Sequence, residues 1–218
     1  MKKVRFLLFL LAALLCLAAC KSLPTLKPHA PGYLHSDGRL YFEAPASYLA
    51  AKRSKEATAR LIDAVGERLL YSAGKGLLCD ENGELYAIDG TFFPSLANFS
   101  PDRVSICKEE VVRTELAAST DGALTESIVA AFETDLLDPE DFGLLQEFST
   151  TRYLLLLFSE DYPDFCFKLE YSVIEKGDDL YEAWPYNVER VGVLYDRNLD
   201  CCALAPASLY QLLTGGLS

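Results

Sequence analysis

Two adjoining segments around residue 160 constrain the fold more than any other part of the chain. Residues 153–158 are a run of six apolar side chains, too short to cross a membrane and typical of a central strand. In residues 165–173, apolar side chains alternate strictly with more polar ones. A period of two places one face of a strand in a core and the other in contact with water. Together the two segments predict an antiparallel sheet.

Further strands and hairpins are indicated by turn residues between short apolar stretches. Asp37-Gly38 and the sequence Asp-Glu-Asn-Gly at 80–83 are typical of tight β-turns. The strand-like segments that surround these turns or follow them are 77–79, 84–88, 104–107, 111–114, 180–184 and 191–195.

The sequence between Pro45 and Gly74 predicts one long helix near the N-terminus of the domain. Ser47 can cap its start, and Gly74 stands just past its end. The apolar residues that recur at helical spacing are Ala57, Leu61, Ile62, Val65 and Leu69. The basic residues Lys52, Arg53, Lys55 and Arg60 lie mostly off this stripe. They form either a solvated helix face or a face that docks on an anionic surface such as a membrane.

Shorter helices are predicted in the second half of the chain. Residues 124–137 carry apolar side chains four apart, and Asp138-Pro139 begins a short third helix with a cap and a first-turn proline. A last helix covers 206–214 and ends at a pair of glycines. The predicted fold class is therefore α+β, an antiparallel sheet with one long N-terminal helix and two or three shorter helices.

The first twenty residues have the pattern of an export signal. Lys2, Lys3 and Arg5 precede an apolar stretch at 6–17, which is shorter than the roughly 20 residues that a membrane-spanning helix needs. The stretch ends in Leu-Ala-Ala-Cys at 17–20, which resembles the lipobox of bacterial lipoproteins. The alternatives are an ordinary signal peptide that leaves a free thiol and a plain membrane anchor.

The resemblance implies that the thiol of Cys20 is acylated and that the chain is cut just before it. The protein would then be held by lipid in the cell membrane or outer membrane, on the extracytoplasmic side. Lys21 follows Cys20, and the family's sorting habit implies the outer membrane where there are two. The expected organisation is a signal peptide at 1–19, a lipidated proline-rich tether at 20–32 and a single α+β domain at 33–218.

The net charge of the chain limits the classes of molecule that it can bind. The signal segment contains three of the twenty Lys and Arg residues and no acid, so the rest of the chain has 17 basic and 32 acidic side chains, a formal charge of −15. Such a surface repels nucleic acid. It favours cationic peptides, basic protein surfaces or metal cations, although acidity also serves simple solubility.

No familiar catalytic or metal-binding pattern is present. The two histidines, His29 and His35, lie in the expected tether and beside a hairpin turn, and there is no G-x-S-x-G or C-x-x-C motif. The segment 196–200 begins like a calcium loop, but Cys201 stands where the loop needs glycine. The 32 acids supply carboxylate pairs without singling one out, and only Glu182 adjoins an aromatic cluster. We therefore assign no catalytic residue, metal ligand or cofactor.

Five cysteines follow Cys20, and an odd number leaves at least one thiol free or paired between chains. Export permits disulfides, and one internal disulfide is possible among Cys166, Cys201 and Cys202. The alternative is that the thiols are buried and act as small hydrophobic side chains.

These features favour a non-enzymatic role over an enzymatic one. The expected function is a membrane-anchored envelope lipoprotein that acts as a binding or assembly module, with an envelope protein as a possible partner. The alternative is an envelope hydrolase that uses carboxylates. Two buried, converging acids would favour the hydrolase, whereas an exposed apolar patch or a free sheet edge would favour the binding module.

Overall fold

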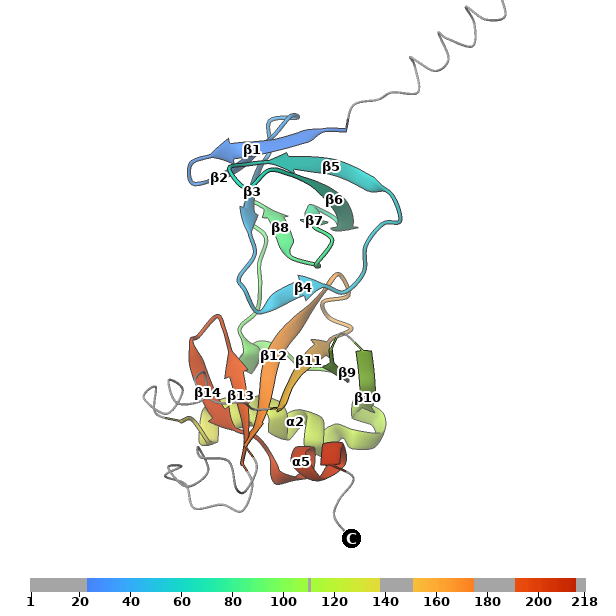
Figure 1. The fold of residues 1–218 in the computed structure, drawn as a ribbon, viewed down its shortest axis with the longest axis vertical. Helices are drawn as coiled ribbons and strands as arrows, with labels where there is room; N and C mark the ends of the chain where they lie inside the picture. Colours follow the sequence, from blue (N-terminus) through green and yellow to red (C-terminus); the bar gives the residue numbers. More distant parts are fainter. Residues whose placement is uncertain (1–22, 110, 138–150, 175–190, 215–218) are drawn as a thin grey trace, which may run out of the picture.

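The computed structural model describes residues 23–109, 111–137, 151–174 and 191–214. Within them the chain forms a small closed β-barrel, followed in the sequence by a second β-sheet that packs against helices (Figure 1). The barrel strands are β1 (Thr25–His29), β2 (Gly32–His35), β3 (Leu40–Glu43), β5 (Ala57–Ile62), β6 (Glu67–Gly74), β7 (Leu77–Cys79) and β8 (Leu85–Ile88). Their order around the barrel is β1-β2-β3-β8-β7-β6-β5. The parallel pairing of β1 with β5 closes the ring.

The barrel has its own core because alternate residues of its short strands point inward. These buried residues are Leu26, Tyr41, Ala59, Leu61, Leu70, Leu78 and Tyr86. The predicted glycines lie in the tight turns. Gly38 and Gly83 both have a positive φ, a backbone angle that residues with a Cβ rarely adopt. The hairpins predicted around 37–38 and 80–83 are therefore confirmed as β2–β3 and β7–β8.

The prediction of a long helix between Pro45 and Gly74 is wrong, since that segment contains strands β4 (Tyr48–Ala50), β5 and β6. Asp63 reverses the chain between β5 and β6: its Oδ1 accepts hydrogen bonds from the amides of Val65 (2.9 Å) and Gly66 (3.2 Å). Val65 is 86% exposed and Leu69 is 40% exposed, so the proposed apolar stripe does not share one buried face. The basic helix face consequently does not exist.

A second sheet follows the barrel in the chain, in the order β10-β9-β11-β12-β13-β14, with β4 added against β12. Its strands are β9 (Arg103–Lys108), β10 (Val111–Ala117), β11 (Thr151–Phe158), β12 (Phe165–Ile174), β13 (Val191–Asp196) and β14 (Cys201–Leu204). Strand β11 pairs with β9 and β12, as predicted for a central strand. Alternate residues of β12 from Phe165 to Val173 enter the core, in agreement with the predicted period of two.

Two helices in the described residues pack against one face of this sheet: α2 (Ala118–Thr134) and α5 (Ala207–Thr214) (Figure 1). A single 3-10 turn, η1 (Leu96–Asn98), precedes β9. Helix α2 corresponds to the helix predicted at 124–137, and α5 to the last predicted helix. The third predicted helix after Asp138 and the strand at 180–184 lie outside the described residues. The predicted fold class is wrong, because the described chain is mostly β, with a seven-stranded barrel and two α-helices.

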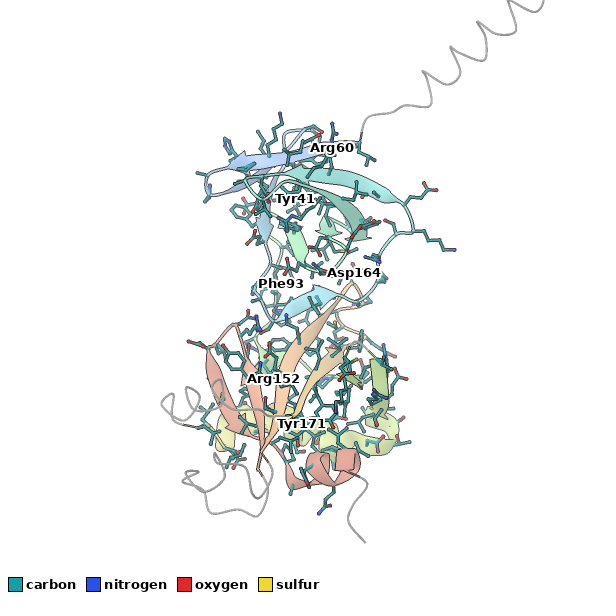
Figure 2. The ribbon with its side chains drawn as sticks, viewed as in Figure 1. Tyr41, Arg60, Phe93, Arg152, Asp164 and Tyr171 are labelled. Carbon is teal, nitrogen blue, oxygen red and sulfur yellow. The ribbon has the colours of Figure 1, made fainter. Side chains whose placement is uncertain are left out.

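The outer side of the barrel strands β7 and β8 contributes to the core of the sheet, which is separate from the barrel's own core. Leu77, Leu85 and Ala87 point outward from β7 and β8 and pack in the same cluster as the inner face of the sheet. Tyr48 of β4 lies at the junction, with its ring against Phe93, Phe165 and Phe167 at centroid distances of 4.9 to 5.2 Å. The barrel is therefore seated on one end of the sheet (Figure 2).

The proline-rich segment expected to be a tether at 20–32 belongs partly to the barrel. Strand β1 covers Thr25–His29, and Leu26 is fully buried in the barrel core. The folded domain thus begins near Thr25 rather than at residue 33. None of the described helices is long and apolar enough to span a bilayer.

Candidate functional site

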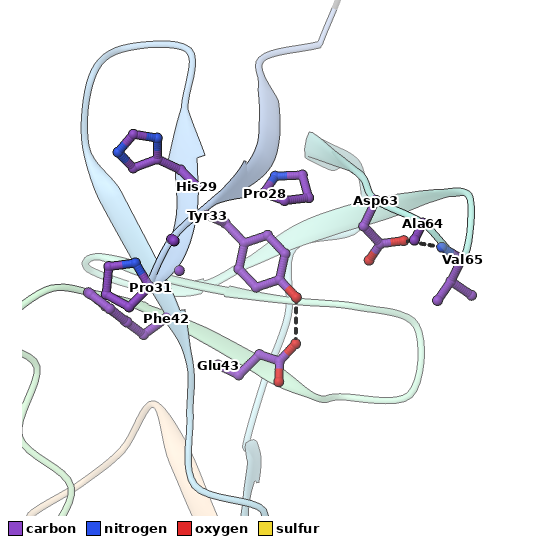
Figure 3. Close-up of a pocket in the computed structure, with 11 residues that line it drawn as sticks. Pro28, His29, Pro31, Tyr33, Phe42, Glu43, Asp63, Ala64 and Val65 are labelled. Carbon is purple, nitrogen blue, oxygen red and sulfur yellow. Dashed lines mark hydrogen bonds between the residues drawn. The ribbon is translucent and has the colours of Figure 1, made fainter.

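A pocket opens at the end of the barrel where β1 turns into β2 and β5 turns into β6 (Figure 3). Its volume is about 780 Å³, within the range of small-molecule sites. The residues that line it are Pro28, His29, Ala30, Pro31, Gly32, Tyr33, Phe42, Glu43, Asp63, Ala64 and Val65. The walls are thus mainly proline, aromatic and aliphatic side chains, with two carboxylates among them.

Tyr33 and Glu43 form the polar centre of this pocket. The Tyr33 hydroxyl donates a hydrogen bond of 2.7 Å to Glu43 Oε1 (Figure 3). That hydrogen bond, followed by burial, raises the pKa of Tyr33 to about 12, so the phenol is neutral at physiological pH. The Tyr33 ring also packs edge-on against Tyr86, with centroids 5.6 Å apart, which fixes the direction of the hydroxyl.

Asp63 supplies the second carboxylate and is held by Arg68. Arg68 Nη2 lies 2.7 Å from Asp63 Oδ2, and the Arg68 hydrogen bond is the main reason why the pKa of Asp63 is lowered. Asp63 is therefore ionised at neutral pH. The Nε of Arg68 is buried without a hydrogen-bond partner in the described part of the chain.

This arrangement is suited to binding. The apolar walls can bury the body of a ligand, while Glu43 can accept a hydrogen bond or attract a cationic group. The charge of Asp63 is already paired with Arg68. Asp63 is a poor general acid, because an acid catalyst must carry a proton near neutral pH and the pKa of Asp63 is lowered.

A smaller cavity of about 210 Å³ lies between the barrel and the sheet. Three basic side chains line it, Arg68, Lys168 and Arg197, together with Glu43 and Glu84. Burial, and then the nearby charge of Arg197, lowers the pKa of Lys168. Arg197 Nε in turn lies 2.5 Å from Glu170 Oε1. Because both signs of charge meet across the junction, we interpret this cavity as part of the contact between the two units.

The residues that the sequence analysis singled out as candidate site residues do not form one site in the described part of the chain. Cys20 is outside the described residues. Cys166 on β12, and Cys201 and Cys202 on β14, are all free thiols, so the possible internal disulfide is not formed among them. Strand β13 separates β12 from β14. Glu182 and its aromatic neighbours also lie outside the described residues.

Asp196, the first residue of the calcium-loop imitation, is buried and has a structural role. Its Oδ1 accepts hydrogen bonds from the Ser47 hydroxyl (2.6 Å) and the Asn198 amide (2.8 Å). Among the residues that the structure describes, no three His, Cys, Asp or Glu side chains are grouped so as to hold a metal ion. Of the histidines, His29 lines the barrel-end pocket, whereas His35 is buried and its Nδ1 accepts a hydrogen bond from the Asp37 amide.

Tyr33, Glu43 and Asp63 were not predicted as site residues. The β2–β3 hairpin brings Tyr33 and Glu43 together, and Asp63, just after β5, joins them through the closure of the barrel. No local motif marks the three residues as a set. The one available signal was Asp63 three residues before Gly66, a turn pattern that the helix prediction masked.

Comparison of the chain with known protein families, with curated proteins and with solved structures finds no match.

Proposed function

We propose that the protein is a bacterial envelope lipoprotein, acylated at Cys20, whose folded part is a binding module with its ligand site at the end of the barrel. The observation that carries the binding role is the barrel-end pocket, in which apolar walls surround Tyr33, Glu43 and Asp63. The observation that carries the anchoring is the lipobox-like sequence at 17–20. The acidic composition of the chain and the Glu43 carboxylate in the pocket favour a ligand with a cationic group on an apolar body.

A carboxylate-dependent hydrolase is the second candidate, because Glu43 and Asp63 line one pocket. Such an enzyme needs one carboxyl group that keeps a proton and one that does not. Asp63 can take only the ionised role, which leaves Glu43 as the acid in this alternative. The hydrolase is tested with Glu43→Gln, which should abolish cleavage of envelope polysaccharide while ligand retention remains measurable.

Anchoring is tested with Cys20→Ala. We expect the wild-type protein to partition into detergent and to carry the mass of a diacylglycerol at Cys20. The Cys20→Ala variant should move to the soluble fraction. Wild-type protein that stays with membranes but has no lipid mass would refute the acylation.

The binding role is tested by co-purification from detergent-solubilised membranes with two surface variants. Val65 lines the pocket and is 86% exposed, so Val65→Lys should place a repelling charge at the site without disturbing the core. Phe92 is 69% exposed and lies outside the pocket, so Phe92→Lys is the matched control. A ligand or partner retained by wild type and Phe92→Lys but lost from Val65→Lys supports the proposal. Equal retention by all three proteins would exclude the pocket as the binding site.

A further inference from the structure

The chain between the acylated cysteine and the barrel is short. Strand β1 begins at Thr25, five residues after Cys20 in the sequence. A fully extended chain spans at most about 3.6 Å per residue, so Thr25 can lie no further than about 18 Å from Cys20. The start of the barrel is therefore held within about 18 Å of the surface in which the lipid is inserted.

The topology determines which wall of the barrel is held there. In the closed order, β1 lies across the ring from β7 and β8, and β5 is the neighbour of β1. The outward side chains of β7 and β8 pack on the sheet, so the wall that carries the anchor points away from the sheet. Figure 1 shows β1 and β5 at one end of the molecule and α5 at the other. In Figure 2, Arg60 of β5 lies on the side remote from Arg152 and Tyr171 of the sheet.

This wall has a chemical character that differs from the acidic chain as a whole. Lys27 of β1 is paired in register with Leu34 of β2, and Arg60 of β5 with Leu69 of β6. The two leucines are 39% and 40% exposed. We call these four residues, Lys27, Leu34, Arg60 and Leu69, the anchor-side wall. Its pattern of basic and apolar side chains fits a membrane surface with anionic headgroups.

The charges on the anchor-side wall are only partly compensated. Arg60 Nη1 lies 3.2 Å from Glu67 Oε1, and its Nε donates to Thr25 Oγ1 at 3.1 Å. Lys27 is exposed and makes no ion pair with any described residue. Its ammonium group is thus available to form an ion pair with the phosphate of a lipid headgroup.

We propose that the anchor-side wall lies on the bilayer and contacts anionic phospholipid headgroups, so that the barrel is membrane-proximal and the sheet points away from the membrane. This inference rests on the proposed acylation of Cys20. It also places the pocket mouth beside the membrane surface, because the pocket opens between strand ends of the same barrel.

The test measures fluorescence energy transfer from the acylated full-length mature protein to the membrane. The protein is placed in vesicles of phosphatidylcholine and phosphatidylglycerol, in which some lipid headgroups carry the energy acceptor. A fluorophore is attached at Leu34→Cys or at Leu212→Cys. Leu34 is 39% exposed on the wall, and Leu212 is 41% exposed on α5, so the two sites are matched in residue type and exposure. The native thiols of Cys79, Cys107, Cys166 and Cys202 are buried, and Cys201 is changed to Ser in both proteins. We expect energy transfer several-fold stronger from position 34 than from position 212.

Equal energy transfer from the two positions, or stronger transfer from position 212, would overturn the inference while leaving acylation intact. Absence of the lipid mass at Cys20 would instead refute the proposed function.

A flexible insert of about 15 residues between Lys21 and Ser22 should reduce the difference in energy transfer between the two positions, because such a linker spans about 20 Å on average. In the anionic vesicles Lys27→Glu should lower transfer from position 34, whereas Lys75→Glu, in an exposed turn near the junction, should leave it unchanged.

Discussion

The cysteines of the folded domain show at the residue scale how position determines reactivity. Burial raises the pKa of Cys166 and of Cys202 to about 12. Burial also raises the pKa of Cys79 and Cys107. Cys201 is only half-buried, but burial and the nearby Asp196 and Asp200 raise its pKa as well. Since the thiolate is the reactive form, none of these cysteines is activated at neutral pH.

We therefore predict slow and selective thiol labelling. In native protein at pH 8, a thiol reagent should modify Cys201 slowly and the four buried cysteines hardly at all. In urea without reductant all five should react, and Cys201→Ser should remove the native reaction. Recovery of only three thiols in urea would reveal a disulfide and contradict the structure.

At the element scale, strand β1 shows how the N-terminal segment differs from the expected tether. Pro24, Pro28 and Pro31 lie close together in the sequence and predicted a tether, although only Pro28 belongs to β1. Only Leu26 points into the core, so the strand shows no periodicity. Pro28 is tolerated because β5 pairs with β1 at Thr25 and Leu26 but not at Pro28. Barrel closure depends on this non-local pairing, which no short sequence pattern contains.

The integration of β1 is testable with two leucines on opposite sides of the barrel wall. Leu26→Ala removes a fully buried side chain and should cost about 2–5 kcal/mol in the free energy of unfolding, measured in urea. Leu34→Ala, on the exposed side, should cost well under half as much. Equal, small effects would mean that 25–29 behaves as a tether after all.

Elements with strong local periodicity were predictable, and those defined by long-range pairing were not. The alternation in residues 165–173 and the apolar run at 153–158 identified β12 and β11 because each strand is buried in a regular pattern. The β5–β6 hairpin was misread because Leu61, Val65 and Leu69 lie four apart, although Val65 occupies the turn. The pocket could not be predicted for the same reason, since Asp63 joins Tyr33 and Glu43 of the β2–β3 hairpin only after the barrel closes.

At the scale of the whole molecule, the barrel and the sheet are joined by hydrogen bonds as well as by the packing of β7 and β8 in the core of the sheet. Ser47 is fully buried in the connection from β3 to β4. Its hydroxyl donates to Asp196, and its amide donates to Asn198 Oδ1 at 3.0 Å. These bonds join residues about 150 positions apart in the sequence. Asp196 ends β13, and Asn198 lies in the turn that follows.

We predict that the two units unfold in one transition. Ser47→Ala leaves the buried Asp196 carboxylate without one donor and should cost about 1–3 kcal/mol. Hydrogen exchange should show that protection in β8 and in β12 falls together. The exposed Ser100→Ala is the control and should have no measurable effect. Separate loss of protection in the barrel alone would show that the junction does not couple the units.

The position of β1 between β2 and β5 has a mechanical consequence. With the lipid at Cys20, as proposed above, a force that pulls the protein from the membrane would act along the strand. Hydrogen bonds on both sides of β1 are then loaded in shear and must break together, rather than one after another as in peeling. The barrel can resist extraction only while β1 stays paired, so tension on the anchor is also tension on the fold.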